Sequence, residues 1–163
     1  MLGARVRRCR HEKRYRVDEE LVKQRLDQAL ASYSLEFGAF FLAKFLGLEI
    51  EYIPDACIVR FKGEQFESNP QGTVHGGIVA TVMDISMGHL VNHLKGPATT
   101  LEMKVQYLRP VGFREYRAIG EVVKIGREIW FLKSTLEDLD GEVAAFATST
   151  WKLLAPHRGG ISC

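Results

Sequence analysis

One long apolar segment followed by four strand-like runs constrains the fold of this chain more than any other feature. The segment extends from Ile78 to about Leu94 and ends before Gly96-Pro97, a pair that is typical of the end of a helix. The next runs read TTLEMKVQYL, EYRAIGEVVKI, EIWFLKSTLED and EVAAFATSTWKLL. They alternate between apolar and polar residues or are rich in β-branched and aromatic ones, which predicts strands.

Short turns separate the last three of these predicted strands. Gly126-Arg127 and Asp140-Gly141 stand between them and favour β-hairpins. Several of the runs are apolar on both faces, as where Ile129 and Phe131 alternate with Trp130 and Leu132. A helix can cover one face of such a sheet, and a second copy of the chain is the simplest cover for the other.

The N-terminal half adds two helical segments and two strands. Helical spacing extends from Val17 to about Ser32, and a second apolar segment, SLEFGAFFLAKFLGL, begins at Ser34 with Gly47 as its expected stop. The runs LEIEYI and CIVRFKG follow as short strands. The order predicts an α+β domain in which an antiparallel sheet surrounds one central helix.

Length and charge divide the chain into a single domain with two tails. A chain of 163 residues is one domain by the usual prior, and we assign it to residues 17–154, with residues 17–47 as a helical extension. Residues 1–16 hold seven of the 22 basic residues and one of the 20 acidic ones, so we expect a flexible basic arm. Residues 155–163 are expected to form a loose tail.

Composition indicates the cellular compartment of the protein and the classes of partner it can have. The three cysteines, Cys9, Cys57 and Cys163, are far apart and show no zinc spacing, which predicts reduced thiols and a cytoplasmic protein. The apolar runs are shorter than a membrane span, and the sequence shows no signature of nucleic-acid binding. We therefore expect neither a membrane nor a nucleic acid as partner.

The segment NPQGTVHGGIVATVMD, residues 69–84, concentrates the residues that suggest chemistry. His75-Gly76-Gly77 stands where the apolar helix should begin, and the first N–H groups of a helix have no partner within it. Glycine lets a ligand oxygen approach these groups closely, so the N–H of Gly76 or Gly77 can stabilise the oxyanion of an acyl-transfer intermediate. Asp84 follows two turns later, where an apolar helix does not favour a charge, and its carboxylate can activate water or attack a carbonyl.

Other groups of residues give weaker evidence for a metal site, a serine nucleophile or a nucleotide-binding loop. His89 and His93 have a spacing that can bind metal, but no third ligand is evident, so we expect no metal. The serines lack the context of a nucleophile elbow, and phosphate-binding or dinucleotide-binding glycine motifs are absent from the sequence.

The segment 69–84, together with TTLEMKVQYLRP after it, resembles the hotdog-fold acyl-CoA thioesterases, in particular the branch of the phenylacetate-pathway (PaaI-like) thioesterase. The resemblance covers roughly residues 35–154. It implies a hotdog fold, with an antiparallel sheet wrapped around a long central helix, and hydrolysis of an acyl- or aryl-CoA to the free acid and CoA. It also implies a homo-oligomer, a dimer or a dimer of dimers, with the active site between subunits and with no metal or cofactor beyond the CoA of the substrate.

The resemblance assigns roles to five residues. Asp84 corresponds to the catalytic general base or nucleophile, and Gly76 to the glycine whose N–H polarises the thioester carbonyl. Asn69 corresponds to the asparagine that helps hold this carbonyl, and His75 either assists the leaving thiolate or braces the loop. Thr100 stands where relatives orient the water, although its strand parity leaves open whether Thr99 or Thr100 faces the site.

Six further residues are candidates for binding the substrate or its CoA part. They are Gly77, Thr99, Tyr107, Arg109, Gly126 and Arg127, of which the two arginines could bind phosphates.

Two alternatives remain open at this point. One is a hotdog enoyl-CoA hydratase or dehydratase, although such enzymes typically follow the histidine with Phe-Pro rather than Gly-Gly. The other is a non-catalytic module that binds acyl-CoA, which would not need a desolvated carboxylate such as Asp84 beside the carbonyl.

Overall fold

A computed structural model describes residues 17–155, so the predicted basic arm and all but the first residue of the predicted tail lie outside the described residues. The described chain forms three α-helices, one short 3-10 helix and six strands. The elements are α1 (Glu19–Ser32), α2 (Phe41–Phe45), β1 (Glu49–Ile53), β2 (Ala56–Lys62), η1 (Gln65–Glu67), α3 (Gly76–Leu94), β3 (Ala98–Tyr107), β4 (Glu115–Ile125), β5 (Ile129–Asp138) and β6 (Val143–Leu153).

The helical extension differs from its prediction in one respect. Asp18 caps α1 by accepting hydrogen bonds from the N–H groups of Glu20 and Leu21, as its position before two acidic residues suggests. The second helix begins at Phe41 rather than Ser34. Residues 34–39 instead form a closed turn, in which the N–H of Ser34 donates to the carbonyl oxygen of Ala39 at 2.8 Å. Gly47 follows α2 with a φ of 63°, which explains why the helix ends there.

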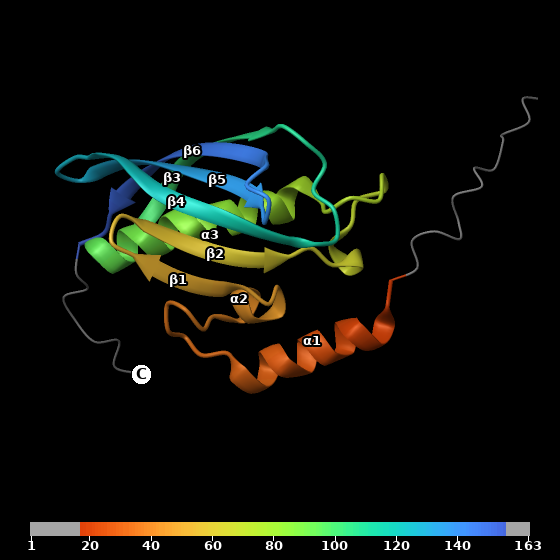
Figure 1. The fold of residues 1–163 in the computed structure, drawn as a ribbon. Helices are drawn as coiled ribbons and strands as arrows, with labels where there is room; N and C mark the ends of the chain where they lie inside the picture. The colour runs from red at the N-terminus through yellow and green to blue at the C-terminus, as the bar shows by residue number, and fades with distance from the viewer. Residues whose placement is uncertain (1–16, 156–163) are drawn as a thin grey trace, which may run out of the picture.

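The six strands form one antiparallel sheet in the order β1-β2-β4-β5-β6-β3. The sheet curves around α3, while α1 and α2 lie on the β1 side of the molecule (Figure 1). The predicted central helix surrounded by an antiparallel sheet is confirmed.

The core lies between α3 and the concave face of the sheet. Ten residues of α3 from Val79 to Val91 are buried, and Trp130 and Leu132 of β5 face them. Two glycines allow the close approach of helix and sheet. A Cβ on Gly120 of β4 would lie 2.6 Å from the carbonyl oxygen of Ser86, and one on Gly88 would lie 2.7 Å from the ring of Trp151.

β3 pairs with β6 on one side only and forms an edge of the sheet. It contains a bulge at Leu101, because Thr100 pairs with Trp151 whereas Glu102 pairs with the next residue back, Thr150. The bulge reverses the parity of the strand. Thr100 therefore points towards α3, on the same side as Met103 and Val105, although simple alternation would place it opposite them.

Candidate active site

Asp84 is held on α3 by a hydroxyl of the edge strand. The Oγ1 of Thr100 donates a hydrogen bond of 2.9 Å to Oδ1 of Asp84, which leaves Oδ2 free of this bond. Burial raises the pKa of the Asp84 carboxyl above its usual value, and the hydrogen bond from Thr100 opposes this rise in part. A carboxylate with a raised pKa is suited to accept a proton from water near neutral pH.

The sequence left open whether Thr99 or Thr100 faces the site, and the structure shows which of them contacts Asp84. Thr100 contacts Asp84, whereas Thr99 is exposed and lines the same cavity without a hydrogen bond to Asp84. The strand bulge after Thr100 causes this arrangement, and the alternation of the sequence does not reveal it.

The start of α3 carries the predicted oxyanion donor. His75 is the N-cap, and its Nδ1 accepts the N–H of Gly77 at 2.9 Å. This bond occupies one of the two candidate N–H groups. The N–H of Gly76, the first residue of the helix, has no partner within the helix and points outwards at the positive end of its dipole. Gly76 is therefore the better donor of the two.

Tyr107 closes over the same helix end. Its hydroxyl donates to the carbonyl oxygen of Gly76 at 2.8 Å, and a Cβ on Gly76 would lie 3.2 Å from the tyrosine ring. Glycine at position 76 thus serves two purposes, since it leaves its N–H accessible and gives Tyr107 room to pack.

Asn69 organises the turn that leads into the helix. Its Oδ1 accepts the N–H groups of Gln71 and Thr73, and its Nδ2 donates to Oγ1 of Thr73 at 2.9 Å. The side-chain amide has two N–H bonds, so one of them is not needed for the bond to Thr73. In this chain the residue braces the turn, and it can still offer a donor to a ligand.

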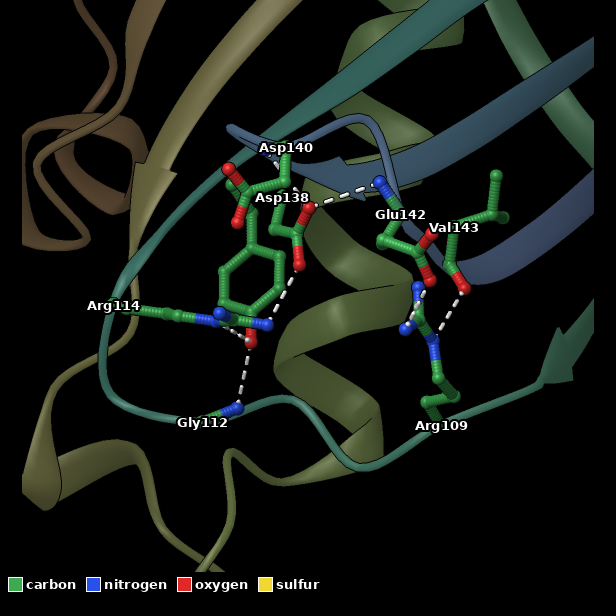
Figure 2. Close-up of polar contacts among 8 residues, drawn as sticks. Arg109, Gly112, Arg114, Asp138, Asp140, Glu142 and Val143 are labelled. Atoms are coloured by element: carbon green, nitrogen blue, oxygen red, sulfur yellow. Dashed lines mark hydrogen bonds and ion pairs between the residues drawn. The ribbon is translucent and has the colours of Figure 1, made fainter.

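A polar network fixes the loop that supports this turn. The carbonyl oxygen of Val111 accepts the N–H of Val74, next to His75. Figure 2 shows how the same loop, residues 108–114, is tied to the β5–β6 turn, where Arg114 donates to Asp138 at 2.7 Å. The N–H of Gly112 also donates to the hydroxyl of Tyr116 at 2.9 Å. The backbone N–H of Glu142, together with the Arg114 guanidinium and the N–H of Asp140, holds the pKa of Asp138 below its usual range.

Arg109 belongs to this loop and is already paired. Its guanidinium binds the carboxylate of Glu142 at 2.7 Å and the carbonyl oxygen of Val143 at 3.0 Å (Figure 2). A phosphate at this position would have to compete with Glu142. The other predicted phosphate ligand, Arg127, lies with Gly126 in the β4–β5 turn, and neither of these two residues lines a cavity that contains other predicted site residues.

Apart from His75, the predicted catalytic residues of one chain line two separate cavities. Asp84, Thr99 and Thr100 line a cavity of about 450 Å³. Asn69, Gly76, Tyr107 and Arg109 line another of about 430 Å³. Eight residues of helix separate Gly76 from Asp84, which is about 12 Å along the axis. One chain therefore does not bring the carboxylate and the oxyanion donor to the same carbonyl.

The structure also shows site residues that the sequence pattern did not reveal. Leu35, Phe37 and Phe40 of the helical extension line the Asp84 cavity, together with His89 of α3. The aromatic run FGAFF, residues 37–41, is the sequence signal that could have pointed to this wall. Within residues 17–155, the His, Cys, Asp and Glu side chains form no group of three or more placed to hold a metal ion. No helix in that range is long and apolar enough to cross a membrane.

Comparison with known sequences groups this chain with thioesterases. A family model described as the thioesterase superfamily matches residues 71–145. Human acyl-coenzyme A thioesterase 13 is 31% identical over 108 residues, which cover 64% of this chain and 71% of that protein. A Saccharolobus solfataricus relative named as an esterase is 28% identical over 85 residues, which cover 51% of this chain and 61% of the relative.

Two solved structures show the same fold. A Bacillus halodurans protein, solved with CoA, aligns with a TM-score of 0.71 and 26% identity, covering 83% of this chain and 89% of that one. The PaaI protein from the phenylacetic acid degradation operon of E. coli aligns with a TM-score of 0.70 and 16% identity, covering 80% and 96%. The second likeness concerns the fold alone, and it confirms the predicted arrangement of sheet and helix.

Proposed function

The chain belongs to the thioesterase superfamily of hotdog-fold thioester hydrolases, and on that premise we propose that it hydrolyses acyl-CoA at a site shared by two copies of the chain. The observation that carries this proposal is the Asp84–Thr100 pair, a half-buried carboxylate with a raised pKa that lines a cavity. The human relative is named as an acyl-coenzyme A thioesterase, and the Bacillus halodurans neighbour was solved with CoA. Both support CoA thioesters as the substrate class.

In the proposed reaction, Asp84 takes a proton from water while the water oxygen attacks the thioester carbonyl carbon. The negative charge that develops on the carbonyl oxygen is stabilised by the N–H of Gly76, with the amide of Asn69 beside it. When the intermediate collapses, the carbon–sulfur bond breaks, and the proton held by Asp84 passes to the departing CoA thiolate. The products are the free acid and CoA. Thr100 keeps one carboxylate oxygen in place so that the other faces the water.

The separation of the two cavities supports a shared site. Gly76 and Asn69 of one copy have to meet Asp84 and Thr100 of the other, since about 12 Å of helix keeps Gly76 and Asp84 of one chain apart. The free edge of β3 supports this pairing. It is ten residues long, and Leu101, Tyr107 and Leu108 along it and just beyond it are more than half exposed. Such an edge is a ready template for a second strand, and a two-fold axis there would bring the same surface of both copies together.

Thiol release from a panel of acyl-CoAs tests the proposed reaction. Asp84→Asn keeps the size of the side chain and its bond to Thr100 but removes the base, so we expect the rate to fall by roughly 10²–10⁴. The matched control is Asp55→Asn, because Asp55 is exposed in the β1–β2 turn and lines neither cavity. Turnover by Asp84→Asn close to that of wild type would contradict the assignment.

Asp84 could act as the nucleophile instead of the general base. A nucleophilic carboxylate would form an acyl-enzyme anhydride, which appears as a burst of CoA release before the steady state. We expect no burst if the carboxylate activates water.

A further inference from the structure

The helical extension contributes one wall of the Asp84 cavity. Leu35, Phe37, Phe40 and Leu42 line it from the extension, opposite the face of α3 that carries Asp84. We propose that the turn of residues 34–40, and Phe37 in particular, sets the size of the acyl group that the site accepts, limiting it to a short aliphatic chain or a single aromatic ring. This inference rests on the proposed thioesterase function and specifies its substrate class.

The cavity runs along one face of α3. Thr81, Asp84, Ile85, Gly88 and His89 line it and recur at spacings of three and four, so they form one face of the helix. Asp84 and His89 are five residues apart, which is about 7.5 Å along the axis. An acyl group whose carbonyl lies at Asp84 would therefore extend towards His89.

The end of the cavity near His89 is aromatic and firmly held. The ring of Phe37 lies 4.5 Å from that of His89, measured between centroids. The hydroxyl of Tyr52 is 2.8 Å from Nδ1 of His89, and Tyr52 also stacks on His93 at 4.2 Å. Burial lowers the pKa of His89 to about 4, so the ring is neutral near pH 7. A neutral, fixed ring beneath Phe37 is a steric barrier to a longer chain.

The turn that carries Phe37 is closed by its own hydrogen bonds and leaves the apolar side chains of Leu35 and Phe37 exposed. The N–H groups of Gly38 and Ala39 both donate to the carbonyl oxygen of Glu36. Leu35 is fully exposed and Phe37 is 48% exposed, yet both line the cavity. A bound apolar acyl group would cover these side chains, which explains their placement better than packing within the chain does.

The opposite wall leaves little room to widen the cavity. Gly88 lies against the ring of Trp151, which is itself almost fully buried and donates from Nε1 to Ser149 at 2.7 Å. Because the helix and Trp151 are both fixed, the turn of residues 34–40 is the wall whose side chains decide how much space remains.

Kinetic constants for a series of CoA esters test this inference, with butyryl-, hexanoyl-, phenylacetyl-, dodecanoyl- and palmitoyl-CoA as probes. We expect wild type to prefer the three shorter substrates. Phe37→Ala should raise the ratio of kcat/KM for dodecanoyl-CoA to that for hexanoyl-CoA by roughly tenfold or more, since pocket contacts of this size discriminate by such factors. Phe37→Trp should reduce kcat/KM for phenylacetyl-CoA. The matched control is Phe131→Ala, an exposed phenylalanine of β5 that lines neither site cavity and should leave the ratio unchanged.

The possible results of this experiment distinguish the proposed thioesterase function from the inference about Phe37. If wild type hydrolyses none of the five esters, the proposed function fails, and the inference about Phe37 fails with it. If wild type hydrolyses them but neither Phe37→Ala nor Phe37→Trp changes the ratios, the inference alone is overturned. Because one variant reduces the side chain and the other enlarges it, a folding defect in one still leaves the other to decide.

Discussion

At the scale of single residues, the site depends on one hydrogen bond between a helix and an edge strand. Burial alone would raise the pKa of Asp84 further, and the Thr100 hydroxyl counteracts it by stabilising the charged form. As the proposed general base, Asp84 acts when it is deprotonated. The rate should therefore fall as the pH decreases through the pKa that Asp84 has in the folded protein.

Replacing Thr100 by valine should shift the acidic limb of the pH–rate profile, where the rate falls with decreasing pH, to higher pH. Valine has nearly the same shape but donates no hydrogen bond, so the carboxyl loses the interaction that lowers its pKa. The pH dependence of kcat/KM reports this pKa in the free enzyme. Thr99→Val is the matched control, since Thr99 makes no hydrogen bond to Asp84 and should leave the limb in place. A limb that stays at its wild-type position in Thr100→Val would argue against Asp84 as the titrating base.

At the scale of elements, the first turn of α3 explains why the motif has a histidine followed by two glycines. His75 caps the helix and occupies the N–H of Gly77, and Tyr107 takes the carbonyl oxygen of Gly76. The N–H of Gly76 remains as the proposed oxyanion donor. This claim concerns a backbone atom, so an ordinary side-chain substitution does not remove it.

Proline at position 76 provides a direct test of that N–H. Proline is tolerated at the first position of a helix, and His75 already has the extended conformation that a following proline requires, with φ −61° and ψ 135°. Gly76→Pro should therefore fold but lose roughly 10²–10³ in kcat, the usual cost of one oxyanion donor. Gly76→Ala keeps the N–H while adding the same Cβ near Tyr107, and it should retain most of the activity. Equal losses in both variants would indicate that crowding of Tyr107, and not the missing donor, is responsible.

The sequence predicts an element well when the residues that determine it lie within that element. Hydrophobic periodicity and turn residues located α3 and all six strands to within a few residues, because each signal lies within its own element. The second helix was predicted seven residues too early, since the apolar run from Ser34 to Ala39 packs over the cavity instead of continuing the helix. The choice of Thr100 over Thr99 depended on a bulge, which arises from pairing with β6 and has no local signature.

At the scale of the whole molecule, one chain is incomplete for the proposed reaction. Its two cavities each hold half of the proposed chemistry, and the unpaired edge of β3 offers the surface through which two copies can join. In the sequence, the strands that are apolar on both faces suggested a second copy of the chain, and the resemblance to a family suggested a site between two copies. The distance of about 12 Å between Gly76 and Asp84 follows from helix geometry alone. That the two residues line different cavities could be seen only in the folded chain.

Complementation between two inactive variants tests this central claim most directly. Asp84→Asn and Gly76→Pro chains, each with its own affinity tag, are produced together, and assemblies that contain both are isolated. If the site is shared, each mixed pair has one site with both defects and one with none, so about half of the wild-type thioesterase activity should return. Assemblies of either variant alone remain inactive as controls. Mixed assemblies no more active than their parents would contradict the account, because they would show that Asp84 and Gly76 act within the same chain.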